Sequence, residues 1–206
     1  GNLFHGKLGT SFSGSQDAAM ATADLTFAKG DAAFQYRGSG ATADDLRYAG
    51  GTVADSGYET THHEITGAWR TKGGYIALDA GFSATRDAGT PALPMDMIKD
   101  DAWNFGLTQK ESFHWGSMEN RLYVHDIDHL MDNNSLRPTP IPPAGMAMEA
   151  PSSSRDYGWR SDVLLPRGES KLRAGIDFHG LRHLPDAEVV KTLVAVPGIG
   201  VWTAEI

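Results

Sequence analysis

The chain has 206 residues, a formal net charge of −8 and no cysteine. The acidic balance argues against a general nucleic-acid-binding surface, and the lack of cysteine excludes disulfides, thiolate metal sites and cysteine nucleophiles. Glycine accounts for 24 of the 206 residues, which favours turns and strands over long helices. No stretch approaches the ~20 apolar residues of a membrane-spanning helix. Membrane strands stay possible, because their apolar residues come at every second position.

From residue 3 to about residue 180 the dominant hydrophobic period is two, which predicts an all-β, antiparallel fold. Tight-turn signals separate the alternating runs at 29–31, 71–74, 114–118 and 166–169. We expect about nine strands, most of them of roughly ten or more residues. One continuous apolar face should contain Leu25, Phe27, Phe34, Tyr36, Ile76, Leu78 and Phe82.

Strand length separates two all-β interpretations. Strands of soluble sandwiches usually have about five or six residues, whereas strands of membrane barrels need about 9–11. The second face is rich in Thr, Ser, Asp, Gln, Arg and Gly, which suits a wet lumen. The tight turns alternate with longer connections at 39–56, 86–100 and 130–154. The sequence therefore predicts a partial transmembrane-type β-barrel, with a soluble antiparallel sandwich or solenoid as the alternative.

The last residues differ in character from the strand region. Segment 184–193 reads as a helix with Pro185 and acidic residues in its first turn, and 196–200 (VPGIG) reads as a tight turn. A helix–hairpin–helix does not continue a series of long strands. We therefore predict two parts, a barrel segment at 1–180 and a short helical tail at 181–206.

Three stretches of the strand region follow one another in a distinctive order: 89–97 (GTPALPMDM), 125–133 (HDIDHLMDN) and 150–158 (APSSSRDYG). Together they resemble the barrel of TonB-dependent outer-membrane receptors, most closely the copper receptors. The resemblance covers residues from about 3 to 180. It implies a barrel of about 22 strands with an N-terminal plug.

The resemblance also implies a function and a location. It implies a receptor, not an enzyme, that takes up scarce metal in the outer membrane of a Gram-negative bacterium. Outer-membrane lipid would surround the receptor, and the TonB system would energise it. No plug, TonB-interacting segment or closing strand is visible in this sequence. We therefore expect the chain to be a fragment of such a barrel.

The sharpest chemical feature is His129-Leu130-Met131. Residues two apart in a strand point to the same side, so the imidazole and the thioether can reach one ion, and this donor pair favours Cu(I) over hard cations. The resemblance adds that copper receptors use a His-x-Met at the outer end of a barrel strand, with further ligands from the plug. We predict that His129 and Met131 bind Cu(I). By contrast, Asp96, Asp100 and Asp101 lack the spacing and the glycine of a calcium loop.

Further methionines lie close in sequence to this pair. Met146 and Met148 are two apart in the Pro-rich segment 137–151, and Met95 and Met97 repeat the spacing. We include Met146 and Met148 in the predicted copper site, because loop thioethers can pass Cu(I) along at low affinity. The alternative is that they pack the loop against the barrel rim.

The tail supports a second hypothesis. Leu193, 196–200 and 202–204 (WTA) resemble the helix–hairpin–helix of DNA glycosylases that act on 3-methyladenine. In that family the hairpin binds a DNA phosphate through its backbone. The residues implied here are Gly198, Gly200 and Thr203. The family's catalytic Asp lies downstream of the hairpin, beyond this sequence, so we expect no base-excision activity. A third hypothesis is a soluble all-β protein without a metal role; nucleic acid is an expected partner only in the glycosylase interpretation.

Overall fold

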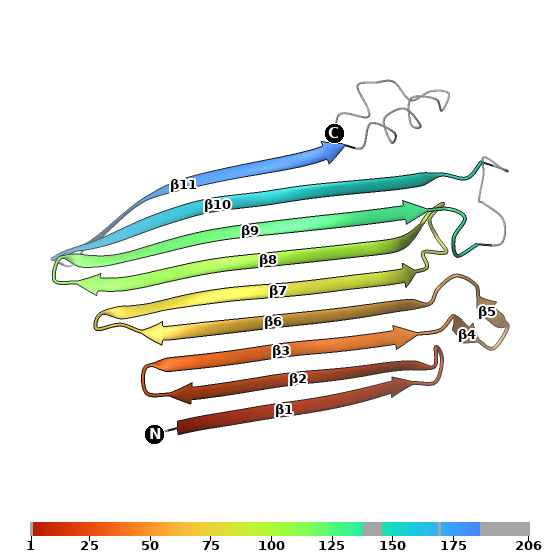
Figure 1. The fold of residues 1–206 in the computed structure, drawn as a ribbon, viewed down its shortest axis with the longest axis horizontal. Coiled ribbons are helices and arrows are strands. Elements are labelled where there is room, and N and C mark those ends of the chain that lie inside the picture. The colour runs from red at the N-terminus through yellow and green to blue at the C-terminus, as the bar shows by residue number, and fades with distance from the viewer. Residues whose placement is uncertain (1, 138–145, 169, 186–206) are drawn as a thin grey trace.

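The computed structural model describes residues 2–137, 146–168 and 170–185, and all regular secondary structure within them is β-strand. Nine strands form one antiparallel sheet in the order β1-β2-β3-β6-β7-β8-β9-β10-β11, and β4 and β5 form a small hairpin inserted between β3 and β6 (Figure 1). Their bounds are β1 Asn2–Ser13, β2 Ala18–Lys29, β3 Ala32–Ala43, β4 Leu46–Tyr48, β5 Gly51–Val53, β6 Tyr58–Arg70, β7 Gly74–Ala88, β8 Asp96–Phe113, β9 Gly116–Asp132, β10 Glu149–Arg167 and β11 Ser170–Pro185. The all-β, antiparallel prediction with long strands is confirmed.

The predicted helical tail cannot be compared with the structure. Residues 186–206, which include Gly198, Gly200 and Thr203, lie outside the described residues. Strand β11 runs to Pro185, so the sheet continues slightly beyond residue 180, where the sequence predicts the boundary. The division of the chain into two parts stays a prediction.

The connections differ at the two ends of the sheet, as predicted. At one end the turns are tight, and Gly30 and Gly168 have φ values of +61° and +63°, which glycine adopts without a steric penalty. At the other end lie the connections 44–57, 89–95 and 133–148. All three are shorter than the predicted 39–56, 86–100 and 130–154, because the β3–β6, β7–β8 and β9–β10 ladders continue beyond the predicted strand ends. We refer to this second end as the loop end.

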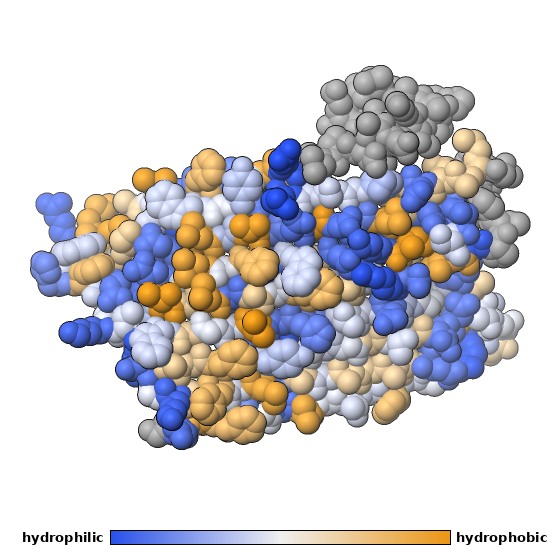
Figure 2. All heavy atoms as spheres, viewed as in Figure 1, coloured by the Kyte–Doolittle hydropathy of each residue, from blue (hydrophilic) through white to orange (hydrophobic). Residues whose placement is uncertain are grey.

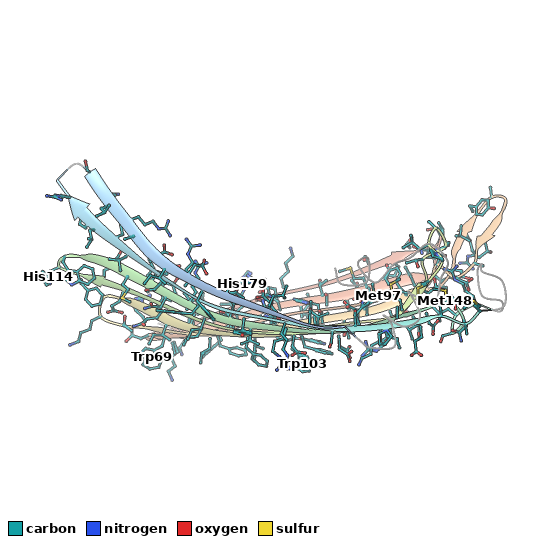
Figure 3. All side chains as sticks on the ribbon, turned by 90° about the horizontal axis from the view of Figure 1, so that it is seen from above. Trp69, Met97, Trp103, His114, Met148 and His179 are labelled. Carbon is teal, nitrogen blue, oxygen red and sulfur yellow. The ribbon has the colours of Figure 1, made fainter. Side chains whose placement is uncertain are left out.

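One face of the sheet is apolar. The registers align Leu25 with Tyr36, Tyr36 with Ile65, and Ile65 with Ala80. Because side chains alternate along a strand, all seven residues of the predicted apolar face lie on this side. Figure 3 shows Trp69 and Trp103 on the same side of the curved sheet, with His179 on the opposite side.

No second layer of the described residues covers the apolar face. Leu78 is 61% exposed and Phe105 is 53% exposed, and among the described residues Ala43 is the only buried hydrophobic one. Figure 2 shows hydrophobic side chains spread over the sheet, with hydrophilic ones at both ends of the strands. An exposed apolar surface of this extent marks a face that contacts a membrane, another protein or another apolar partner. Within the described ranges there is no helix of the length and apolarity required to cross a membrane.

The opposite face is polar. Asp24, Arg37 and Glu64 lie in one register row across β2, β3 and β6. The guanidinium of Arg37 lies 3.7 Å from the carboxylate of Asp24 and 3.8 Å from that of Glu64. These ion pairs are largely exposed and contribute little to stability, but they show that this face is suited to water.

The apolar face ends before the loop end is reached. Its last aromatic pair is Phe82 and Trp103, with ring centroids 4.4 Å apart. On the same face, the ion pair of Arg155 with Asp126 lies in the row of this aromatic pair. The ion pairs of Arg86 with Asp101 and of Lys99 with Asp128 lie beyond it. On β7 to β10 the apolar surface is therefore a belt with a polar boundary on its loop-end side.

Candidate metal site at the loop end

His129 and Met131 both lie on the polar face of β9, two residues apart and close to the end of the strand. The cross-strand partners of His129 are Asp100 in β8 and Ser152 in β10. The imidazole is 24% exposed, so it is partly shielded but within reach of an ion from the polar side. This position matches the same-side arrangement that the spacing predicts.

Asp100 orients the imidazole of His129. Nδ1 of His129 lies 3.1 Å from Oδ1 of Asp100. With the proton on Nδ1, the ring donates a hydrogen bond to the carboxylate and keeps the lone pair on Nε2 free for a metal. The sequence alone does not predict this contact of Asp100, because the partner of His129 depends on strand register.

Met97 is the direct cross-strand partner of Met131. Directly opposite residues in an antiparallel pair have Cβ atoms about 4.5–5.5 Å apart, so two flexible thioethers can meet at one ion. The register between β8 and β9 shifts by one residue between Met97 and Lys99, which marks a β-bulge. Met97 was not among the predicted ligands.

Asn133 fixes the backbone of the two loop methionines. Its side chain is buried, with 1% exposure; Nδ2 donates to the carbonyl of Met146 at 3.0 Å, and Oδ1 accepts from the N–H of Met148 at 2.7 Å. The N–H of Asn133 also donates to the carbonyl of Met148 at 3.2 Å. Met148 thus lies opposite Asn133, two residues beyond Met131 along β9. Met146 is 48% exposed, and no hydrogen bond joins its side chain to His129.

The loop end also contains a buried ion pair. Asp96 is fully buried, and Arg137 is 7% exposed. Nη2 of Arg137 donates to Oδ1 of Asp96 at 2.6 Å and to the carbonyl of Thr90 at 3.1 Å, and the N–H of Thr90 donates to Oδ1 of Asp96 at 2.7 Å. Burial alone would raise the pKa of Asp96, but the hydrogen bonds from Arg137 and Thr90 outweigh burial and hold this pKa below its usual range. The pair joins connection 89–95 to segment 133–137.

The donor types at the loop end suit a soft cation. In residues 2–137, 146–168 and 170–185, no group of three or more His, Asp and Glu side chains could hold a metal ion. The register places the imidazole of His129 and the thioethers of Met97 and Met131 at neighbouring positions of β8 and β9. Figure 3 shows Met97 and Met148 at the same end of the sheet. Imidazole and thioether ligands favour Cu(I) over hard cations such as Mg²⁺ and Ca²⁺.

The sheet belongs to a recognisable structural class. A curved, antiparallel sheet of nine strands, apolar on one face and polar on the other, resembles part of a barrel. Among solved structures the chain is similar to the copper transporter OprC, with a TM-score of 0.75 and 22% sequence identity, over 87% of this chain and 29% of that chain. The similarity shows the fold, and the aligned region spans less than a third of the OprC chain. Protein-family models and curated proteins give no match.

Proposed function

We propose that the chain forms part of the barrel wall of a TonB-dependent outer-membrane copper receptor. The observation that carries the proposal is the pair His129 and Met131 at the loop end of a sheet that resembles the wall of a copper transporter. Copper is the transported substrate in this proposal, and the chain is a receptor rather than an enzyme. The orientation of the imidazole by Asp100 further supports a metal-binding role.

The proposal assigns a partner to each face of the sheet. Outer-membrane lipid of a Gram-negative bacterium covers the apolar face, since Leu78, Phe105 and their neighbours are exposed there. The polar face lines the lumen. Energy comes from the TonB system, which the family resemblance implies.

Within the proposed site the residues have distinct roles. Nε2 of His129 and the sulfur of Met131 bind Cu(I), while Met148 and the more exposed Met146 supply thioethers at the entrance. Neutral imidazole is required for binding, and the hydrogen bond to Asp100 selects the tautomer that binds. No described residue supports the glycosylase alternative, since the hairpin of the tail lies outside the described part of the chain.

Replacing Met131 by Leu should lower the Cu(I) affinity at least about tenfold and remove the preference for Cu(I) over Zn(II). Leucine keeps the volume of methionine but has no sulfur, and a thioether contributes little to zinc binding. The measurement is a competition titration with a Cu(I) chelator on the detergent-solubilised chain. Met20→Leu is the control, because Met20 is a 42% exposed methionine on the polar face of a distant strand. Equal Cu(I) affinity of wild type and Met131→Leu would show that Met131 is only a packing residue.

Replacing Asp100 by Ala should weaken Cu(I) binding by about 10–100-fold, the usual effect of removing a group that orients a metal-bound histidine. The matched control is Asp101→Ala, which removes the same charge from the neighbouring position. Asp101 faces the other side of β8 and pairs with Arg86 and Lys99 instead. The same chelator titration distinguishes them: an equal effect of both substitutions would indicate a general charge effect and not orientation of His129.

A further inference from the structure

The bulge in β8 decides which residue lies opposite Met131. On one side of the bulge Asp100 pairs with His129 and Lys99 pairs with Leu130. If this register continued, Ile98 would lie opposite Met131, and Met97 would lie one step on and point to the other face. The extra residue instead aligns Met97 with Met131. A bulge of this kind redirects side chains beyond it.

The irregularity is shared with the neighbouring strand β7. Ala88 pairs with Met97 and Arg86 pairs with Lys99, so β7 keeps its register with β8 across the bulge. Between them, Asp87 has a φ of +47°, the left-handed conformation that few residues other than glycine adopt. Such backbone conformations persist where the surrounding structure enforces them, and they are concentrated at functional sites. The sheet therefore maintains an unfavourable local conformation at the position that turns Met97 toward Met131.

We propose that Met97 is a third Cu(I) ligand, which the bulge at Ile98 brings to the pair His129 and Met131. This inference rests on the proposed function and adds a ligand from a different strand. Cβ atoms of directly opposite residues are about 4.5–5.5 Å apart, and the three rotatable bonds of methionine allow both sulfurs to reach a common ion. One imidazole and two thioethers then hold the ion from β8 and β9 together.

The first test is Met97→Leu, with Met95→Leu as the matched control. Met95 is two residues away and precedes β8, so it has the same side chain without a cross-strand partner in the sheet. Loss of a group that only orients a ligand already lowers metal affinity about 10–100-fold, so we expect Met97→Leu to weaken Cu(I) binding at least about tenfold. Met95→Leu should bind as wild type does. X-ray absorption at the copper edge should show one fewer sulfur neighbour in Met97→Leu.

The second test removes the bulge and keeps every ligand. Deletion of Ile98 should restore the continuous register and move Met97 into the place of Ile98, which is again opposite Met131 and on the same face. The Cu(I) affinity and the number of sulfur neighbours should therefore stay close to those of wild type. Combining the deletion with Met97→Leu should weaken Cu(I) binding as Met97→Leu alone does, because the thioether is then missing in either register. Wild-type affinity and an unchanged sulfur count in Met97→Leu would overturn the inference. If wild type and Met131→Leu bind Cu(I) equally, the proposed function fails instead, so the two failures are distinguishable.

Discussion

Replacing Leu78 by Arg should reduce binding of the chain to lipid vesicles about a hundredfold. Leu78 is 61% exposed on the apolar face, between Gly67 and Leu107 on the neighbouring strands. An arginine on the lipid face near the bilayer midplane costs about 2–4 kcal/mol, and each 1.4 kcal/mol is about a factor of ten in a partition constant. Flotation of the chain with phosphatidylcholine vesicles measures the effect.

The control for this prediction is Ala77→Arg. Ala77 is adjacent in sequence but faces the polar side, opposite Ala68 and Thr108. The same charge at this position should leave vesicle binding almost unchanged, because the side chain reaches water in the lumen. Equal losses in the two variants would contradict the assignment of lipid to the apolar face.

Replacing Arg137 by Met should destabilise the loop end by about 3–5 kcal/mol, because it leaves the buried carboxylate of Asp96 without its cation. Amide hydrogen exchange of Thr90, whose N–H binds Asp96, should report the loss. Arg155→Met is the control, since Arg155 and Asp126 form an exposed pair with side chains 61% and 37% accessible. Such a pair contributes at most about 1 kcal/mol. A similar change in exchange for both variants would contradict a special role of the buried pair.

The response to acid should differ between wild type and Arg137→Met. In wild type the pKa of Asp96 is lowered, so its contribution to stability is complete above the unfolded carboxyl pKa of about 3.9 and is lost as the pH falls below it. In Arg137→Met, burial without the cation raises this pKa. Mild acid should therefore neutralise Asp96 in the variant and raise the protection of the Thr90 amide, measured against the exchange rate of an unfolded chain at the same pH. In wild type, stronger acid should lower this protection.

The apolar face could be predicted from the sequence because it depends only on local alternation. Apolar residues occupy every second position of a strand, as Leu25 and Phe27 do in β2 and Ile76 does in β7. The apolar residues of one strand therefore share a face, whatever the register of the neighbouring strands. The same reasoning places His129 and Met131 on one side of β9. These are properties of a single strand.

The rest of the candidate site depends on alignment between strands, which has no local signal. The contact of Asp100 with His129 and the pairing of Met97 with Met131 both require the register of β8 against β9, and a bulge at Ile98 changes that register midway. The partner of Asp96 is Arg137, 41 residues away in sequence. The spacing of Asp96 in the sequence could exclude a calcium loop, but it could not predict the ion pair of Asp96 with Arg137.

The length of the strands also sets how far the candidate site lies from the edge of the apolar belt. Strands β8, β9 and β10 have 18, 17 and 19 residues, whereas about 9–11 suffice to cross the hydrocarbon of a bilayer. Met131 lies five residues beyond Asp126, the partner of Trp103 at the edge of the apolar belt. At ~3.4 Å per residue and a tilt of ~40°, this separation amounts to about 13 Å along the membrane normal. An ion at Met131 would be captured outside the hydrocarbon layer, so its binding should be independent of the transmembrane voltage and open to soluble chelators added from the outside.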